Sequence, residues 1–531
     1  MRFLKLFIAI SQLVLTIVAQ ELTQSNLPII VINTFNREIP DEPKITAHMG
    51  IINNENQPNH ISDPFNEYDG YIGIETRGSS SQMFPKKSYS IETRDEIGNN
   101  LNVSLLGMPK ENDWVLYGPY SDKSLLRNAV AYKLYEEMGW YSPRFRFCEL
   151  ILNDEYRGVY LLIEKIKRDK NRVNISKISE DDITGGYIIK IDKTVGSKIE
   201  GWYSAIQSKI YYQYHYPDPD DILDVQKSYI IDFIKLFEEK MWNIDYNNPP
   251  DENYEKVNLE SFVDVAIISE FSKNVDAYRL SFYMYKDRDD KDGRLTAGPI
   301  WDYNLAFGNA NYYEAGNTDG WKIEEGIPPY DGYPIPFWWE KMWQDPYFQQ
   351  KFKNRWIELR KTILNEKHIL CLIDSLTSLI SNAAERNFQK WNILGTYIWP
   401  NYFIWKTWDE EILYLKRWIA QRINWIDNEL GLSNLTYDDN SLIKDLDLIK
   451  IYPNPTNSKI NILINLKSSP TKLRIKIFSI NGQELYSVND FTPDSRTTVL
   501  TLPLQNLNSG VYIVKITGKN INLKEKFILL K

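Results

Sequence analysis

The stretch NVDAYRLSFYMYKDRDDKDGRLTAGPIWDYN, residues 274–304, decides how the middle of the chain folds. LSFYMYKD and RLTAG read as two short strands, and the polar segment RDDKDG between them reads as a turn, so the stretch predicts a hairpin. With the turn centred near residue 290, residues whose numbers sum to about 580 lie opposite one another, which places Asp302 across from Tyr278. Asp276 and Asp302 are therefore expected at the same open end of the hairpin.

The residues on either side of the two aspartates indicate what they do. ESFVDVAIISEFSKN, from Glu260, has apolar residues at helical spacing and predicts a helix that ends near Asn274. Asp302 stands in an apolar stretch, which predicts a buried carboxylate that holds a cation, pairs with a base or accepts backbone hydrogen bonds. The order helix, aspartate, hairpin, aspartate matches protein kinases, in which the first aspartate is catalytic and the second binds metal. Two structural aspartates that cap turns are the alternative.

The composition limits the classes of function. With 531 residues the chain is expected to form two or more domains. It carries 62 Lys and Arg against 71 Asp and Glu, a net charge of −9, so nothing suggests a nucleic-acid partner. H-R-D, D-F-G and glycine-rich nucleotide loops are absent from the sequence, which excludes an ordinary kinase. No H-E-x-x-H motif supports a zinc site, and no G-x-S-x-G motif supports a serine hydrolase.

The N-terminus, MRFLKLFIAISQLVLTIVAQE, has basic residues, a short apolar run and a small residue at Ala19, which predicts a secretory signal peptide over residues 1–19. No later segment is long enough to predict a membrane span. Cys148 and Cys371 lie in apolar runs and are expected to be small buried hydrophobes, with a disulfide between them as the alternative.

The chain changes character after about residue 430. A helix with Thr407 and Glu410 as its capping box and Gly431 as its stop closes the first domain, residues 28–435. A polar linker, 436–447, precedes short alternating runs that predict a small β-sandwich over 448–531. This tail resembles the C-terminal sorting domain of type IX secretion cargo in Bacteroidetes through IYPNPT, NGQEL, LNSGVYIVKI and FILLK. A carbohydrate-binding or adhesive sandwich is the alternative.

Residues 28–430 resemble the CotH kinases, a family named for spore coat protein H. The motifs that carry the resemblance stand in family order: RGSSSQMFPKKSYSIET, LYGPYSDKSLLRNAVAYKLYEEMG, YRGVYLLIEKIK, GGYIIKID, NVDAYRLSFYMYKD and GPIWDYNLAFG. The resemblance implies a divergent protein-kinase-like fold of the α+β class that binds ATP with Mg²⁺ or Mn²⁺ and phosphorylates serine or threonine in secreted proteins. It also implies that Asp276 is the catalytic aspartate and Asp302 the metal ligand.

Four further residues are candidates for the nucleotide. The alternation in FPKKSYSIE puts Lys86 and Lys87 on opposite faces of a strand, and Lys86 is favoured as the phosphate-binding lysine. Arg77 either contacts phosphate or belongs to a plain polar turn. Arg127, flanked by apolar residues, either reaches phosphate or pairs with a buried carboxylate. Glu164 ends an apolar strand where a kinase hinge would stand.

Two positions depart from the expected pattern. Ser281 stands five residues after Asp276, where an ordinary kinase has a metal-binding asparagine, and Asn304 replaces a second aspartate seen in the family. Asn304 is the candidate second metal ligand. The sequence thus predicts a secreted or surface-exposed kinase, exported through the periplasm by the type IX machinery, acting on secreted or surface proteins. The alternatives are a non-catalytic adhesin or pseudokinase, and a polysaccharide-acting protein whose stretch DGYPIPFWWEKMW lines a glycan cleft.

Overall fold

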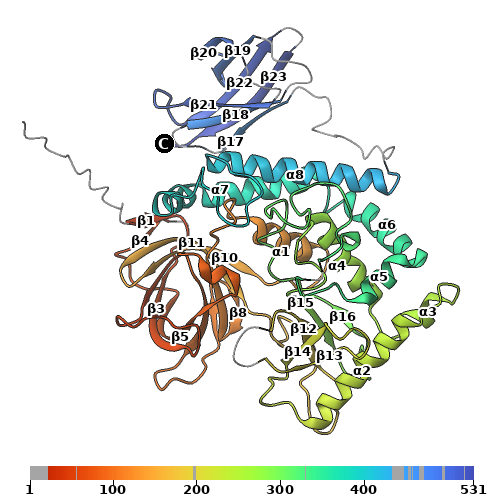
Figure 1. Cartoon of the computed structure of the whole chain (residues 1–531). Coiled ribbons are helices and arrows are strands. Elements are labelled where there is room, and N and C mark those ends of the chain that lie inside the picture. Colours follow the sequence, from red (N-terminus) through yellow and green to blue (C-terminus); the bar gives the residue numbers. More distant parts are fainter. Residues whose placement is uncertain are drawn as a thin grey trace, which may run out of the picture.

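The computed structural model describes residues 22–55, 57–194, 199–328 and 330–432, and in the tail 448–452, 456, 459–465, 472–492, 497–518 and 521–531 (Figure 1). The predicted signal peptide and the predicted linker lie outside the described residues. The described helices and strands confirm an α+β protein with an all-β C-terminal region.

A closed β-barrel forms the first part of the fold. Its strands follow the spatial order β10-β11-β9-β6-β5-β3-β2, and the parallel pairing of β10 with β2 closes it. The barrel strands are β2 (Ile29–Asn33), β3 (Ile45–Ile52), β5 (Tyr68–Arg77), β6 (Ser88–Arg94), β9 (Asp113–Tyr117), β10 (Phe145–Leu152) and β11 (Glu155–Glu164). Alternate residues of these strands fill one apolar core. The small ribbons β1 (Gln24–Ser25) with β4 (Asn59–His60) and β7 (Val103–Leu105) with β8 (Met108–Glu111), and the short helix η1 (Ser80–Met83), complete this part.

A second sheet carries the predicted hairpin. Its order is β13-β14-β12-β15-β16, with β12 (Tyr187–Ile191), β13 (Gly201–Tyr203), β14 (Tyr211–Tyr216), β15 (Phe282–Lys286) and β16 (Thr296–Ala297). In the hairpin β15–β16, Met284 lies opposite Ala297 and Tyr285 opposite Thr296. The register therefore agrees with the predicted one to within a single residue.

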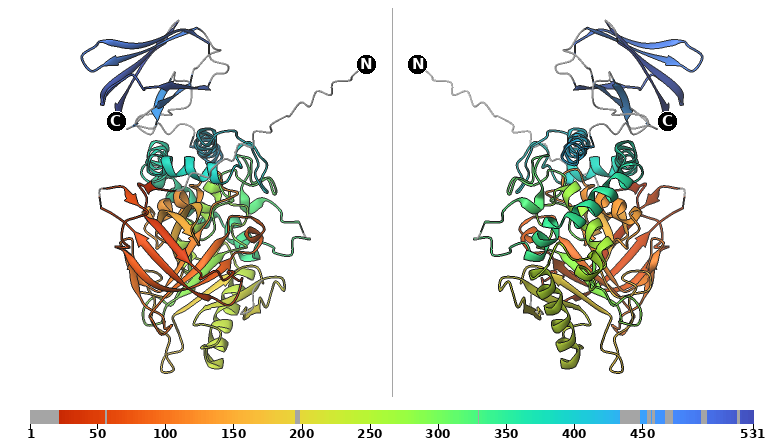
Figure 2. Two further views of the ribbon diagram at one scale, coloured as in Figure 1. Left: turned by 90° about the vertical axis from the view of Figure 1, so that its left-hand side faces the viewer. Right: turned by 90° about the vertical axis from the view of Figure 1, so that its right-hand side faces the viewer.

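The helices pack on the outer face of β10 and β11 and on the second sheet, and share one large core with them (Figure 2). They are α1 (Arg127–Glu137), α2 (Asp224–Trp242), α3 (Pro250–Asn253), α4 (Leu259–Ser272), η2 (Lys322–Glu324), α5 (Phe337–Gln344), α6 (Pro346–Arg360), α7 (Glu366–Lys390) and α8 (Trp408–Glu429). Thr407 and Glu410 form the predicted capping box of α8. Cys148 is buried, but Cys371 is exposed on α7, and both are free thiols. The prediction that both cysteines are buried is therefore wrong for Cys371.

The described tail is a two-sheet sandwich. One sheet has the order β17-β18-β21 and the other β20-β19-β22-β23. Their bounds are β17 (Leu448–Tyr452), β18 (Lys459–Asn465), β19 (Leu473–Ser479), β20 (Glu484–Phe491), β21 (Thr497–Pro503), β22 (Gly510–Gly518) and β23 (Ile521–Leu529). A core of residues between Ile449 and Leu529 fills the space between the sheets.

Candidate functional site

Asp276 and Asp302 lie near one another beyond the open end of the hairpin. Helix α4 ends at Ser272, and Lys273 stops it in a left-handed conformation. The two segments that carry the aspartates are joined by a hydrogen bond from Asn274 Nδ2 to the Asp302 carbonyl, 3.5 Å long. After desolvation, the Asp276 carboxylate is the largest cause that raises the pKa of Asp302. The predicted meeting of the two aspartates is thus found in the structure.

The backbone around the two aspartates is strained. Tyr278, Ser281 and Asp302 have φ values of 72°, 49° and 66°, in the left-handed region that side chains with a Cβ rarely adopt. A bulky residue such as Tyr278 pays most for this conformation. Its hydroxyl donates to the buried Glu270 over 2.7 Å, which holds the turn in place. Strain of this kind gathers at functional sites, where the surrounding contacts enforce it.

Asp302 as a residue is exposed to solvent, so the prediction of a fully enclosed carboxylate is wrong, although the surrounding protein still desolvates the carboxylate. Its neighbour Tyr303 is buried and Trp301 half-buried, and these rings account for the apolar character of the stretch. The left-handed turn at Asp302 leaves the carboxylate at the surface of the site. An exposed carboxylate needs no fixed partner and is free to take a ligand.

The electrostatics of the two aspartates differ. Desolvation by the surrounding protein, then repulsion from Asp276, raises the pKa of Asp302 to about 6, while Arg77 acts against the rise. The pKa of Asp276 is also raised, chiefly by burial, although Arg279 lowers it. The Asp276 side chain is 25% exposed, and one of its oxygens lies 3.0 Å from the Arg279 guanidinium. A cation bound close by would stabilise both carboxylates in their charged form and lower their pKa values.

Strand β12 and the two residues that follow it supply three charged side chains that the sequence analysis missed. Lys190 lies 3.6 Å from Asp192, and Asp192 and Lys193 both act electrostatically on Asp276 and Asp302. Burial opposes the charge on Lys190, but Tyr283 and Asp192 outweigh it and raise its pKa. The signal was present in YIIKID, where alternation puts Lys190 and Asp192 on one face of an otherwise apolar strand.

Arg77 belongs to this group of charges. It ends β5, and its guanidinium lies 5.4 Å from the centre of the Trp301 ring, next to Asp302 in the chain. It acts electrostatically on Asp302, Lys190 and Lys165. The barrel thus contributes one cation to the surroundings of the aspartates, at a position that the sequence analysis named.

Arg127 takes the second of its two predicted roles. Its guanidinium pairs with the buried Asp122 at 2.7 Å and donates to the Ala306 carbonyl at 3.0 Å. Two other α1 residues also hold the Asp302 segment: Asn128 Oδ1 accepts from the Tyr303 amide, and the Tyr132 hydroxyl accepts from the Asp302 amide. Arg127 therefore positions this segment, and its own charge is already neutralised.

Lys86 does not lie with the aspartates. It is buried, and its ammonium donates to the Val159 carbonyl and to Asn387 Oδ1 of α7, each over 2.7 Å. Burial lowers its pKa well below the ordinary lysine value. Both lysines precede β6, so they do not lie on opposite faces of a strand as predicted, but they do differ in burial. Lys87 is half-buried and donates to the Gln82 carbonyl. The buried member, however, fastens the barrel to α7 instead of facing a cleft.

Glu164 is enclosed by partners. Its carboxylate is fully buried, lies 2.8 Å from Arg144 and 3.6 Å from Arg172, and accepts from the Tyr141 hydroxyl at 3.2 Å. These contacts occupy the side chain at the end of β11. Glu164 stabilises the chain there, and its carboxylate is not presented to a nucleotide.

Asn304 and Ser281 are both half-buried. The Asn304 carbonyl accepts from Asn309 Nδ2 at 2.8 Å, which tightens the turn after Asp302. Ser281 lines a cavity of about 20 Å³ between the two aspartate segments, which is room for about one water molecule. The cavity is too small to hold a nucleotide.

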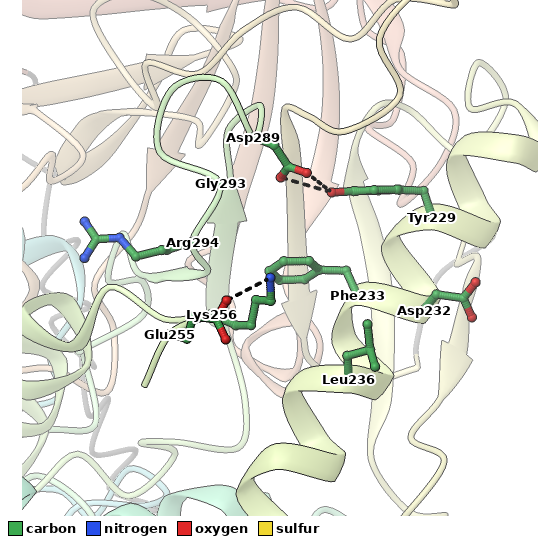
Figure 3. A pocket seen from close by; sticks show the side chains of 9 residues that line it. All are labelled: Tyr229, Asp232, Phe233, Leu236, Glu255, Lys256, Asp289, Gly293 and Arg294. Atoms are coloured by element: carbon green, nitrogen blue, oxygen red, sulfur yellow. Dashed lines mark hydrogen bonds and ion pairs between the residues drawn. The ribbon is translucent and has the colours of Figure 1, made fainter. Parts of the chain in front are cut away.

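Two other features do not form part of this site. A cavity of about 500 Å³ lies at the turn end of the same hairpin, between α2 and residues 255–256, and its lining includes Tyr229, Phe233 and Asp289 (Figure 3). None of the predicted site residues lines it. In the stretch proposed for a glycan cleft, Trp338 and Trp339 are fully buried in the main core, so they cannot stack on a sugar.

The donor set fits magnesium or manganese held together with phosphates. Mg²⁺ binds proteins through one or two carboxylates and keeps waters or substrate phosphates as its other ligands. Asp276 and Asp302 supply two carboxylates, with Asn304 two residues further on. Within the part of the chain that the structure describes, no group of three or more His, Cys, Asp or Glu is placed to hold a metal by itself. No helix of that part is both long and apolar enough to cross a membrane.

The fold and site define an α+β protein with an N-terminal barrel, a helical body and a two-aspartate hairpin. Residues 74–426, more than half of the chain, match the family model described as CotH kinase protein, and the chain belongs to that family. Residues 450–530 match the model described as secretion system C-terminal sorting domain, which marks the protein as a secreted member. A search of curated proteins found no match.

Proposed function

We propose that this protein is a metal-dependent kinase with a divergent kinase-like fold, which transfers the γ-phosphate of ATP to serine or threonine of exported or surface proteins. The observation that carries the proposal is the pair Asp276 and Asp302, brought to one end of a hairpin, coupled electrostatically and bordered by Arg77, Lys190 and Lys193. Carboxylates for a metal beside cations for phosphates are the parts that phosphoryl transfer requires.

Each residue has a distinct role in this proposal. Asp302, with Asn304, holds the metal, which when bound neutralises the charge on the phosphates. Arg77 and Lys193, which both act electrostatically on Asp302, are the cations that would contact the phosphates. Asp276 orients the acceptor hydroxyl and takes its proton, and Arg279 keeps the Asp276 carboxylate in place over 3.0 Å. The raised pKa of Asp276 makes it a better base than an ordinary aspartate.

Two alternatives compete with a kinase. A pseudokinase would keep the fold without transfer, but the strained backbone and the exposed, pKa-shifted Asp302 have a cost that only a function would maintain. A polysaccharide-acting enzyme loses its proposed cleft, because Trp338 and Trp339 are in the core. The sorting domain supports export by the type IX pathway and a final place at the cell surface or outside the cell.

The test compares the parent protein with Asp276→Asn. Purified protein is incubated with γ-labelled ATP and Mg²⁺ or Mn²⁺, and label is followed on the protein itself and on co-secreted proteins. If Asp276 acts at the chemical step, the variant transfers phosphate roughly two to four orders of magnitude more slowly, the usual worth of a positioned base. ATP affinity should scarcely change, because the metal and the cations hold the phosphates.

Asp331→Asn is the matched control, since Asp331 is a second carboxylate bonded to Arg279, at 2.6 Å. It should keep far more activity than Asp276→Asn. Equal transfer by the parent and Asp276→Asn would remove Asp276 from the mechanism. A parent protein that binds ATP with metal but labels nothing would instead identify a pseudokinase.

A further inference from the structure

The loop between α7 and α8, residues 391–407, exposes an unusual number of apolar side chains. Five of them are each between 39% and 46% exposed: Tyr397, Trp399, Tyr402, Phe403 and Ile404. We refer to these five residues as the exposed aromatic surface. The stretch from 397 to 404 contains no charged residue. Contiguous apolar patches of this kind on soluble proteins mark binding sites.

This loop is fastened to the segment that follows Asp302. Ala310 and Asn401 form an antiparallel bridge, and the Asn311 amide donates to the Pro400 carbonyl at 2.9 Å. The Tyr402 amide donates to the Asn309 carbonyl at 3.1 Å. The exposed aromatic surface therefore moves as one unit with the chain that leaves the candidate site.

A chain of contacts joins the surface to Asp276. Arg279 contacts Asp276 and lies 5.6 Å from the centre of the Tyr313 ring. The rings of Tyr313 and Tyr312 are 5.0 Å apart, and Tyr312 is stacked with Trp399 at 6.1 Å with an interplanar angle of 4°. Tyr312 also packs against a small core that contains Val275, the residue before Asp276. The surface thus adjoins the side of the site on which Asp276 would receive the acceptor hydroxyl.

The chemistry of the surface favours a polypeptide over a sugar. The amide groups around it are already bonded: Asn311 Nδ2 to the Tyr397 hydroxyl, Asn317 Oδ1 to the Tyr402 hydroxyl, and Asn401 Nδ2 to the Ser121 carbonyl. Phe403 meets Tyr402 at 88° and Tyr414 at 67°, so the rings make an uneven surface instead of a flat platform. A sugar needs both a flat face and free polar groups, whereas an apolar side chain needs neither.

We propose that the exposed aromatic surface, with Tyr312, is the docking surface for the polypeptide acceptor, and that it binds an apolar side chain close in sequence to the phosphorylated serine or threonine. This inference rests on the proposed kinase function and adds a selection rule to it. The kinase selects an acceptor by the apolar residue near its serine or threonine. The loop 391–407, which contains neither Asp276 nor Asp302, binds that apolar residue.

The test uses the full chain and synthetic peptides with one serine, in which Phe, Leu or Ala occupies each of four positions on either side. Transfer with ATP and Mg²⁺ gives the acceptor KM, and fluorescence polarisation of labelled peptides gives binding without catalysis. The variant is Trp399→Ala, with Phe403→Ser as a second variant. The matched control is Trp242→Ala, because Trp242 is a comparably exposed tryptophan on α2.

For the parent and Trp242→Ala, Phe or Leu at one position should lower the acceptor KM by about tenfold relative to Ala, as expected for one large apolar side chain leaving water. Trp399→Ala should lose this preference while its KM for ATP stays within about twofold. Equal use of all peptides by the parent, or a preference that survives in both surface variants, would overturn the docking site.

The remaining outcomes also decide the matter. If the parent transfers no phosphate, the proposed function fails, and polarisation alone judges docking: a Phe or Leu preference lost in Trp399→Ala supports it, and equal binding overturns it. Binding of a soluble oligosaccharide that is lost in Trp399→Ala would make the surface a glycan site. A parent dimer that dissociates in Trp399→Ala, seen by light scattering, would make it a contact between copies. Either result would overturn the proposal that the surface binds the polypeptide acceptor.

Discussion

Asp302 combines three unfavourable features in one residue. Its backbone is left-handed, its carboxylate faces the like charge of Asp276, and its pKa is raised to about 6. A carboxyl whose folded-state pKa lies above the ordinary value of 3.8 makes the native state less stable at neutral pH than at acid pH. Unfavourable features of this kind are typical of functional sites, where activity is gained at the expense of stability.

Asp302→Asn is therefore expected to separate binding from stability. Metal-dependent ATP binding should be lost, because the ligand oxygen with a full negative charge is gone, and calorimetry measures this directly. At pH 7.5 the melting temperature should rise, because the repulsion by Asp276 disappears. The gain should shrink as the pH falls from about 6 towards 3.8, because the parent carboxyl is then protonated in the folded state.

The same pKa predicts how the parent binds metal. Binding needs the carboxylate, so the affinity for Mg²⁺ with ATP should weaken as the pH falls below about 6. Glu260→Gln, an exposed carboxylate that pairs with Lys351, is the control and should leave the profile unchanged. Unchanged metal-dependent affinity in Asp302→Asn would show that the metal is held elsewhere.

Among the elements, α1 holds the segment that carries Asp302 in place. Three of its side chains, Arg127, Asn128 and Tyr132, hold residues 302–307. The helix itself is fixed by the buried pair of Arg127 with Asp122. A buried pair of this kind contributes little net stability while intact but costs much when one partner is removed.

Arg127→Met should thus lower the free energy of unfolding by about 3 to 5 kcal/mol, because Asp122 is left charged and buried without its partner. It should also weaken ATP binding in the presence of metal, because the Ala306 carbonyl loses its donor. Thermal melting and calorimetry measure the two effects. Arg294→Met removes an exposed pair with Asp292 and should change neither by much. If the variant melts at the parental temperature but binds no ATP, Arg127 contacts the phosphates instead, which is the first of the two roles expected from the sequence.

Lys86 fastens two other elements, the barrel and α7. Lys86→Met should lower the melting temperature by removing a buried donor from Asn387 Oδ1 and the Val159 carbonyl. Asn387 Oδ1 keeps the Val159 amide as a donor, at 3.2 Å, so the expected cost is about 1 to 3 kcal/mol in all. ATP affinity should be unchanged if Lys86 only stabilises the fold and does not contact phosphate. Lys87→Met, next in the chain but half-buried, is the control. Loss of ATP affinity at an unchanged melting temperature would support the phosphate-binding role expected from the sequence.

At the scale of the whole molecule, the chain consists of parts with separate cores. The barrel interior, the helical body and the tail each bury their own set of apolar residues. Helix α8 ends at Glu429, and the first tail strand begins at Leu448. A unit with its own core is expected to fold when the rest is removed.

Deletion of residues 445–531 should therefore leave a folded protein with unchanged ATP binding. Because the sorting domain directs the last export step in our proposal, the truncated protein should accumulate in the periplasm. Cell fractionation and phosphoryl transfer on the recovered protein measure the two effects. Export of the truncated chain at the parental level would show that the tail is a binding module instead.

The sequence by itself determined the local features. Alternation and turn residues predicted the β15–β16 hairpin and its register, and the capping box predicted where α8 begins, because these signals lie within a few residues of one another. The positions of Asp276 and Asp302 followed from the hairpin. The family and the sorting domain were also evident, because their motifs are continuous in the chain.

Only the tertiary structure decided what each charge faces. Lys86 and Lys190 both stand in alternating stretches of sequence, yet Lys86 contacts Asn387 of α7, 301 residues away, and Lys190 lies next to Asp192 at the site. Arg127 pairs with Asp122, and Asp302 is exposed between the half-buried Trp301 and the buried Tyr303. A strand's period fixes the face of a side chain but not the element that covers that face, because covering elements come from distant parts of the chain. For that physical reason the candidate aspartates and Arg77 were predictable, and Lys190 and Lys193 were not.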